Sequence, residues 1–396
     1  MKTLGIIIFL SLFAVLSLGN INRNELNEIA LVYAVGIDME SDNYAVSLQV
    51  INPQPPISQT DKMPVIVYEA KAKSIGKAIE MVSKKISRQL SPAQVQLIVI
   101  GEELAETKGI NNVLNYILRE PGLSSILDIL ITKDISAYDV LKVVSFMEDI
   151  PGNEIVKALR NTEENWGSHQ RVYPTQVKAD ILSRGKEAII PTISLYGKEH
   201  LAEEKALLES TAPKSYLEFS GLTLLNEDKK VGWLNDNQSR AYYLIKDRLK
   251  HSYFSSYCPN DDNKEEFGLT IIHSKTAIHG KITKGKPKFT IKVEVTGDLD
   301  ELNCDLDISK PAGIKKVEDL MEKQIEEGLK DLLVQSQAMN ADFIGFGDVL
   351  RIDDKDSWKE IEDSWQSEIY ATSTFAIETK VIVRNFGDLN IGKRGG

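Results

Sequence analysis

The sequence predicts an α+β protein of three mixed α/β domains, the last of which is an antiparallel sheet covered by a long helix. Three patterns indicate this class. Apolar strand-like runs alternate with segments of helical spacing as far as residue 196, and a meander of strands follows from about residue 265. The longest helical stripe of the chain begins near residue 314. A chain of 396 residues is long enough for two or three domains.

The chain begins with an apolar segment, residues 1–19, in which only Lys2 is charged. Such a run is typical of a secretory signal or of a single membrane anchor. Ser17 and Gly19 are small residues at the spacing that signal peptidase prefers, so a cut between Gly19 and Asn20 would release a soluble protein. Without that cut the run remains as an anchor. Both readings stay open, with a buried core helix as a weaker third.

Residues 20–196 are predicted to form an N-terminal mixed α/β domain. Strand-like runs lie at residues 31–37, 44–51, 65–70, 96–101 and 126–132, and helices are expected to begin at Ser74, Asn111 and Ser136. A further strand at residues 188–195 contains Pro191. Because proline cannot donate a hydrogen bond to a neighbouring strand, we expect this strand at a sheet edge.

Residues 197–260 are predicted to form a small middle α/β module. Residues 216–225 and 230–234 have the pattern of a hairpin joined by a polar turn, and a helix is expected from Asp236. Trp233 lies at the end of this hairpin. Its indole could fill a seam between domains or contact a partner, and both alternatives stay open.

Residues 261–396 are predicted to form an antiparallel sheet with helices. Strands are expected at residues 267–274, 275–282 and 288–296, with a turn near Lys275 and a closing strand at 375–383. The long helix has an apolar stripe formed by Ile314, Val317, Met321, Ile325, Leu329 and Leu332. A second helix at residues 357–368 carries Trp358 and Trp365 on one face. We favour core packing of both over a partner-binding face, because aromatic side chains bury large areas.

Charge and cysteine content exclude some functions. The net charge of −11 argues against a nucleic-acid partner. Cys258 and Cys304 lack the C-x-x-C spacing of zinc or redox sites. A disulfide between them is one alternative in an oxidising compartment, but we favour free thiols, since an exported chain of this size does not need a covalent link.

No pattern in the sequence predicts a catalytic, cofactor or metal site. The five histidines include no H-E-x-x-H motif, and only His273 and His279 lie close together. The acidic residues from Asp298 to Asp307 lack the glycine of a calcium-binding loop, so we expect a solvated turn. The segment Gly345-Phe346-Gly347 lacks the third glycine of a dinucleotide fingerprint and is expected to be a turn.

Four blocks of the sequence carry a resemblance. They are residues 19–30 with Val35-Gly36-Ile37-Asp38, Arg88-Gln89-Leu90-Ser91-Pro92 with residues 96–105, Phe219-Ser220-Gly221-Leu222 with residues 230–234, and residues 341–347 (Ala-Asp-Phe-Ile-Gly-Phe-Gly) with Trp358 and Trp365. In this order, from about residue 18 to 387, the blocks resemble the C subunit of bacterial spore germinant receptors.

The resemblance implies a three-domain lipoprotein on the outer face of the spore inner membrane. It would act with two membrane-embedded subunits, of the A and B types, in sensing nutrients, and the family offers no catalytic residues or cofactor to carry over. One departure matters. The family has a lipidated cysteine where this chain has Asn20, which has no thiol to form the thioether. The alternative is an exported solute-binding or scaffold protein, and a weaker one is an exported hydrolase.

Overall fold

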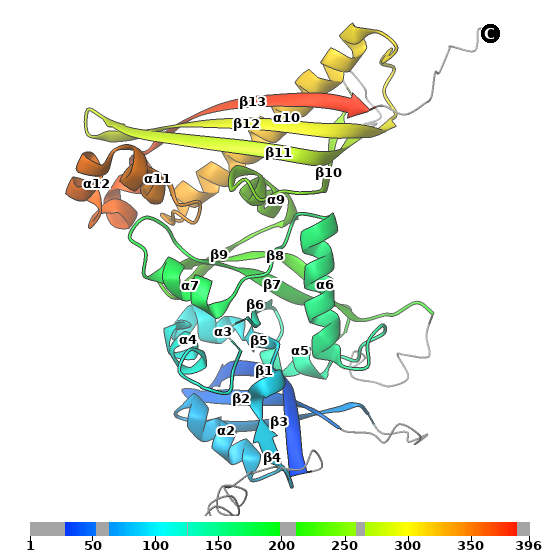
Figure 1. The fold of residues 1–396 in the computed structure, drawn as a ribbon, viewed down its shortest axis with the longest axis vertical. Coiled ribbons are helices and arrows are strands. Elements are labelled where there is room, and N and C mark those ends of the chain that lie inside the picture. Colours follow the sequence, from blue (N-terminus) through cyan, green and yellow to red (C-terminus); the bar gives the residue numbers. More distant parts are fainter. Residues whose placement is uncertain (1–27, 53–62, 125, 199–210, 259–265, 386–396) are drawn as a thin grey trace, which may run out of the picture.

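The computed structural model describes residues 28–52, 63–124, 126–198, 211–258 and 266–385. The residues follow one another along a long molecule, from the first strands at one end to a second sheet at the other (Figure 1). Gly19, Asn20 and the apolar segment 1–19 lie outside the described residues. Within the described part of the chain, no helix has both the length and the apolar character that crossing a membrane requires.

The first sheet has nine strands in the order β3-β2-β1-β5-β6-β7-β8-β9, with β4 beside β1. They are β1 (Ile29–Glu40), β2 (Asn43–Ile51), β3 (Val65–Ala72), β4 (Gln89–Ser91), β5 (Leu97–Ile100), β6 (Asp128–Lys133), β7 (Ile189–Tyr196), β8 (Tyr216–Asn226) and β9 (Lys229–Leu234). Strands β1, β5, β6 and β7 run parallel to one another, and antiparallel strands flank them on both sides. Strand β5 is buried and wholly apolar, and β6 is buried as far as Thr132 with an apolar centre at residues 129–131, as expected for strands covered on both faces.

Helices cover both faces of this sheet. On one face lie α2 (Ile75–Ser83), α3 (Glu102–Thr107), α4 (Asn111–Ile117) and α7 (Pro174–Ile181), and on the other lie α5 (Ala137–Lys142) and α6 (Pro151–Asn165). The predicted caps are confirmed, because the Ser74 hydroxyl accepts from the backbone N–H of Lys77 and the Ser136 hydroxyl from that of Asp139. The N-terminal unit is therefore a three-layer α/β structure.

The positions of β7 and of the hairpin β8–β9 in this sheet differ from the sequence expectations. The strand with Pro191 is not at an edge, since β7 lies between β6 and β8, and the expectation was wrong. The ladder tolerates the proline because the β7–β8 register shifts between Pro191 and Ile193. The hairpin β8–β9, expected in a separate middle module, continues the first sheet. The division at residue 196 stays a prediction.

The C-terminal part begins with α9 (Asp236–Ile245) and builds a second sheet in the order β10-β11-β12-β13. These strands are β10 (Ser252–Tyr257), β11 (Glu266–Thr283), β12 (Lys286–Leu302) and β13 (Thr374–Asn385). The long helix α10 (Pro311–Ala338) packs on one face, and α11 (Phe346–Asp353) and α12 (Lys355–Ile361) lie near the β11–β12 turn (Figure 1). A π-turn at Trp365–Ile369 and a 3-10 turn at Tyr370–Thr372 lead into β13, while another 3-10 turn, Pro92–Gln94, follows β4.

The predicted α+β class is confirmed, with three corrections of detail. Strand β11 is continuous through Lys275, so no turn separates His273 from His279. Strand β13 pairs parallel with β12, so this sheet is not wholly antiparallel. Cys258 and Cys304 form a disulfide with a Cα–Cα distance of 5.3 Å, contrary to the free thiols that we favoured. The pairing of β10 and β12 with opposite edges of β11 brings these two distant cysteines together.

Carboxylates protect both edges of the second sheet. Along β11, the backbone N–H groups of Gly280 and Ile282 donate to Asp353 and Asp354, each at 3.0 Å. Along β13, those of Val381 and Val383 donate to Glu322 and Glu318 of α10, each at 3.1 Å. These side chains occupy donors that would otherwise be open to another strand.

Candidate functional site

The described residues offer no candidate metal site, since no three His, Cys, Asp or Glu side chains among them are grouped to hold an ion. The acidic residues from Asp298 to Asp307 have separate partners. Asp298 pairs with Arg384 at 2.8 Å, and Asp307 pairs with Lys310 at 2.8 Å. The solvated turn expected from Asp298 to Asp307 is wrong for its first half, since β12 runs to Leu302 and includes Asp298 and Asp300; only the later residues lie outside the strand.

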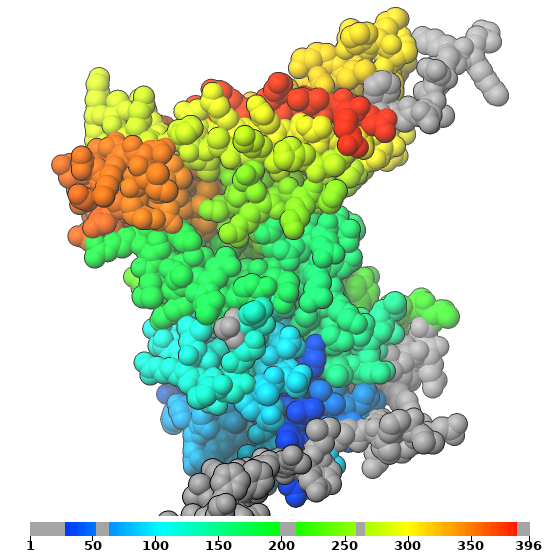
Figure 2. Space-filling view, in the orientation of Figure 1, coloured from blue at the N-terminus to red at the C-terminus, as the bar shows by residue number. Residues whose placement is uncertain are grey.

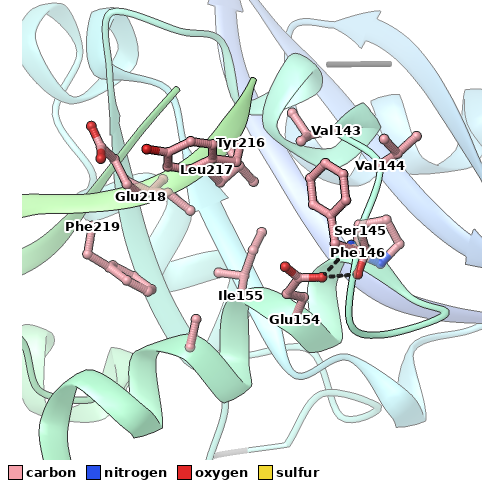
Figure 3. A pocket seen from close by; sticks show the side chains of 13 residues that line it. Val143, Val144, Ser145, Phe146, Glu154, Ile155, Tyr216, Leu217, Glu218 and Phe219 are labelled. Carbon is pink, nitrogen blue, oxygen red and sulfur yellow. Dashed lines mark hydrogen bonds between the residues drawn. The ribbon is translucent and has the colours of Figure 1, made fainter. Parts of the chain in front are cut away.

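An apolar pocket lies between α6 and the start of β8 (Figure 3). Its cavity is about 70 Å³, far below the several hundred Å³ typical of small-molecule sites. The Glu154 carboxylate at its side accepts from the Ser145 hydroxyl and from the backbone N–H groups of Phe146 and Met147, the latter two at 2.9 and 3.1 Å. This carboxylate therefore holds the α5–α6 loop and is not free to act on a substrate.

A second hollow is acidic and lies at the carboxyl ends of β1, β5 and β6, the edge where open α/β sheets often bind ligands. Its central carboxylate, Asp38, accepts from the backbone N–H groups of Ala137 and Tyr138 at 2.8 and 2.9 Å and so caps α5. Burial raises the pKa of Asp38 to about 6. Glu102 accepts from the backbone N–H of Asp134 and pairs with Lys230. These carboxylates close the end of the sheet.

The densest polar arrangement is built by residues 341–347, the last of the blocks singled out in the sequence. The Asp342 side chain is completely buried, and one carboxylate oxygen accepts from the backbone N–H groups of Gly345 and Phe346 at 2.8 and 3.0 Å. The other accepts from the backbone N–H of Gly347 at 2.8 Å and from the Trp365 indole at 3.0 Å. One carboxylate thus folds the loop and attaches it to Trp365.

The geometry of this loop explains why positions 345 and 347 are both glycine. Gly345 has φ +89°, a left-handed conformation that glycine adopts without strain. Gly347 lies so close to the first unit that an added Cβ would be 2.6 Å from the Cα of Gly185 and 2.7 Å from the Trp365 indole nitrogen. The turn expected at Gly345-Phe346-Gly347 is limited to Gly345, which caps helix α11; Phe346 and Gly347 are the first residues of that helix, so the expectation was wrong for these two.

The same loop attaches the C-terminal part to the first unit. The backbone N–H of Glu187 donates to the Asp342 carbonyl at 2.8 Å, and that of Asp348 donates to the Gly185 carbonyl at 3.2 Å. The Lys246 ammonium donates to the Ile344 carbonyl at 2.6 Å. We call this set of contacts between residues 185–187, Lys246 and residues 341–348 the joint. A continuous apolar core surrounds it, with members from β7, β8, α9, α10 and both tryptophans.

The joint contains two buried carboxyl groups with raised pKa values. Burial raises the pKa of Asp342 to about 6, although its four donors act in the opposite direction. Burial, together with the nearby Asp342 charge, raises the pKa of Glu187 to about 7, against the backbone N–H of Glu227 that donates to it at 2.8 Å. Lys246 is a half-buried cation of the joint, and burial lowers its pKa.

The structure places the three predicted interface tryptophans differently. Trp358 and Trp365 are 2% and 0% exposed, and their rings meet edge to face at 5.5 Å. Trp233 is half-buried on β9, under the Lys230 ammonium at 4.4 Å, and its carbonyl accepts from Gln335 of α10 at 2.8 Å. The structure therefore brings Trp365 into the joint and leaves Trp233 at the seam between β9 and α10. Their role toward a partner stays a prediction.

Sequence reasoning missed Glu187 and Lys246 of the joint and one buried histidine. Glu187 and Lys246 belong to no motif, and only their position beside apolar runs could have marked them. His169 is buried, and its Nε2 accepts from the backbone N–H of Gly221 at 2.8 Å, while burial lowers the pKa of His169 to about 4. Gly221 belongs to the third sequence block, so that block also marks a close contact.

Two family models match consecutive segments of this chain. Residues 22–195 match the model of the spore germination protein N-terminal domain, and residues 220–387 match that of the "Spore germination B3/ GerAC like, C-terminal" domain. Spore germination protein KC of Bacillus subtilis (strain 168) is 25% identical over 92% of this chain and 91% of its own. Spore germination protein B3 of the same organism is 22% identical over 93% and 94%.

A solved structure shares the fold. The crystal structure of the GerBC protein has a TM-score of 0.54 and 20% identity, covering 88% of this chain and 96% of the other. The two matched domains are consecutive, and the joint links residues from both. The resemblance drawn from the four sequence blocks is confirmed, and the chain belongs to the GerAC-like family of spore germination proteins.

Proposed function

We propose that this chain is the non-catalytic C subunit of a spore nutrient germinant receptor and acts with membrane-embedded A-type and B-type subunits. Its place would be outside the cytoplasm, on the outer face of the spore inner membrane. The observation that carries the proposal is the match of both family domains, in order, over residues 22–195 and 220–387.

The joint supports a mechanical role in this proposal. Residues of the family block from Asp342 to Gly347 form the contact between the two units, and the Asp342 carboxylate is fully used in holding this block. No catalytic residue is proposed. The chain would keep its two units in a fixed relation while it packs against the membrane subunits, and so stabilise or transmit their response to a nutrient.

Attachment to the membrane would not use a lipidated cysteine, because Asn20 occupies that position. We propose that the apolar segment 1–19 is retained as the anchor. The first measurement is the mass and N-terminus of the chain in membrane and soluble fractions of a sporulating culture. An intact Met1 in the membrane fraction supports the anchor, whereas a soluble chain that begins at Asn20 favours the exported solute-binding or scaffold alternative.

The test of the receptor role is genetic and biochemical. Spores that lack the gene should lose the response to at least one nutrient germinant, measured as release of dipicolinic acid, and the wild-type gene should restore it. A tagged chain purified from spore membranes should bring the A-type and B-type subunits with it. Normal germination of the deletion strain with every nutrient that the parent answers, together with purification of the chain alone, would contradict the proposal.

A further inference from the structure

The hairpin β11–β12 carries a positive surface in an acidic protein. Residues 275–293 contain six lysines and His279 but no Asp or Glu, although the whole chain has a net charge of −11. The end of this hairpin lies beside α11 and α12 and is exposed on the face shown in Figure 2. We call its four exposed lysines, Lys281, Lys284, Lys286 and Lys288, the lysine tip.

The lysines of the tip lack the partners that their neighbours have. Lys292 pairs with Glu378 at 3.1 Å, and His279 lies 3.5 Å from Asp353. None of the four tip lysines has a carboxylate within 4.0 Å in the described part of the chain. Lys281 and Lys288 are directly opposite one another in the strand register, an arrangement of like charges that disfavours the hairpin.

The sequence of the turn is a second indication that the lysines of the tip serve a purpose other than folding. Thr283 pairs with Lys286, and the two residues between them, Lys284 and Gly285, have φ +53° and +74°. Such a turn favours Asn-Gly, because a long side chain is disfavoured in the left-handed conformation. Folding alone would thus place asparagine at position 284. A lysine at position 284 therefore adds positive charge but makes the turn less stable.

The outer face of the hairpin is also open. His279, Lys281, Lys288, Thr290 and Thr374 line a shallow hollow of about 370 Å³. At one side of the hollow Asp353 lies 3.5 Å from His279. Asp353 and Asp354 accept hydrogen bonds from backbone N–H groups along the edge of β11, and in the described part of the chain neither lies within 4.0 Å of a tip lysine.

We infer that the lysine tip binds the phosphate groups of an anionic phospholipid surface, an inference that rests on the membrane role proposed above. Its charge is complementary to such a surface, and clustered lysines that approach an anionic bilayer are attracted to it. A protein partner would require an apolar core with aromatic anchors at the centre of the contact. No large apolar side chain of the described tip residues, 279–290, is exposed, so the tip offers charge without such a core.

The experiment measures lysine acetylation in the full-length chain, which is reconstituted in vesicles and treated with a membrane-impermeant reagent. In phosphatidylglycerol vesicles at low salt, the tip lysines should react at least tenfold more slowly than in phosphatidylcholine vesicles. High salt should abolish the difference. The exposed Lys157 and Lys323 serve as internal controls and should react equally in both.

Three results would overturn the inference. The first is equal reactivity of the tip lysines in both lipids. The second is equal protection by inorganic phosphate in phosphatidylcholine vesicles, which would indicate a site for a small anion. The third is protection in phosphatidylcholine vesicles only when the membrane subunits are present, which would indicate an acidic protein partner.

A matched pair of variants separates binding from folding. Lys281→Gln, Lys284→Asn and Lys288→Gln together remove three charges while relieving the like-charge pair and the strained turn, so the protein should fold at least as well. Protection of Lys286 by phosphatidylglycerol should then fall at least tenfold. Lys157→Gln, Lys323→Gln and Lys84→Gln remove the same charge far from the tip and should leave it unchanged. If the wild-type tip is not protected by lipid but the membrane subunits still co-purify with the chain, only the inference about the tip is wrong. If the membrane subunits do not co-purify, the proposed receptor role is wrong.

Discussion

Asp342 accepts four hydrogen bonds with one buried carboxylate, and an amide cannot replace it. In Asp342→Asn, the NH₂ group would face N–H donors, either those of Gly345 and Phe346 or those of Gly347 and Trp365. Because buried donors without acceptors are costly, we expect the free energy of unfolding to fall by about 3 kcal/mol. Denaturant unfolding measures it. Asp356→Asn, at a fully exposed side chain, should change it by less than about 0.5 kcal/mol.

Glu187 should give the joint a pH dependence. Its pKa is raised from 4.5 to about 7, so between these values the folded protein holds the proton more tightly than the unfolded chain. The stability that this proton contributes is present below pH 4.5 and is lost as the pH rises through about 7, by at most about 1.4 kcal/mol per pH unit. Urea unfolding from pH 5 to 8 should therefore show a flatter dependence for Glu187→Gln. An equal slope in Glu187→Gln and in the exposed control Glu360→Gln would contradict this.

At the scale of elements, the acidic caps of the second sheet should limit association through its edges. Glu318→Ala with Glu322→Ala would free the backbone N–H groups of Val381 and Val383 for pairing with another chain. We expect a concentration-dependent increase in light scattering and a loss of about 1 kcal/mol for each hydrogen bond. Glu326→Ala, on the same helix but paired only with Lys330 among the described residues, is the matched control and should scatter like the wild type.

Element types were more predictable from the sequence than their partners. The stripe of α10 was predicted, and Val317, Met321, Ile325, Leu329 and Leu332 are buried against the second sheet. The parallel pairing of β13 and the Cys258–Cys304 contact depend on segments far apart in the chain, so no local pattern could indicate them. Pro191 was misplaced because a register shift inside a sheet leaves no trace in a single strand.

For the whole molecule, the close approach at Gly347 should decide whether the two units behave as one. Gly347→Ala places a Cβ 2.6 Å from Gly185, so the joint must open or distort, at a cost of up to roughly 3 kcal/mol. Calorimetry should then show two transitions in place of one, and small-angle scattering a larger radius of gyration. Gly328→Ala in α10, where a Cβ would meet nothing within 4 Å, should raise stability by about 0.5–1 kcal/mol. Matching calorimetric profiles for both variants would argue against the joint.

Only one side of the candidate site could be predicted from the sequence. The sequence drew attention to residues 341–347 and to Trp365, and these form one side of the joint. Its other side, Gly185 and Glu187, was not predicted, because a contact across about 160 residues leaves no periodic signal.

The continuation of the first sheet into β8 and β9 has a mechanical consequence. The C-terminal part follows directly from Leu234, the last residue of a strand that is hydrogen-bonded into that sheet. A force applied to the second sheet therefore enters the first as shear across a ladder of backbone hydrogen bonds, which is stiff, and not as extension of a loose tether. Small displacements at one end of the molecule would be conveyed to the other with little loss in amplitude.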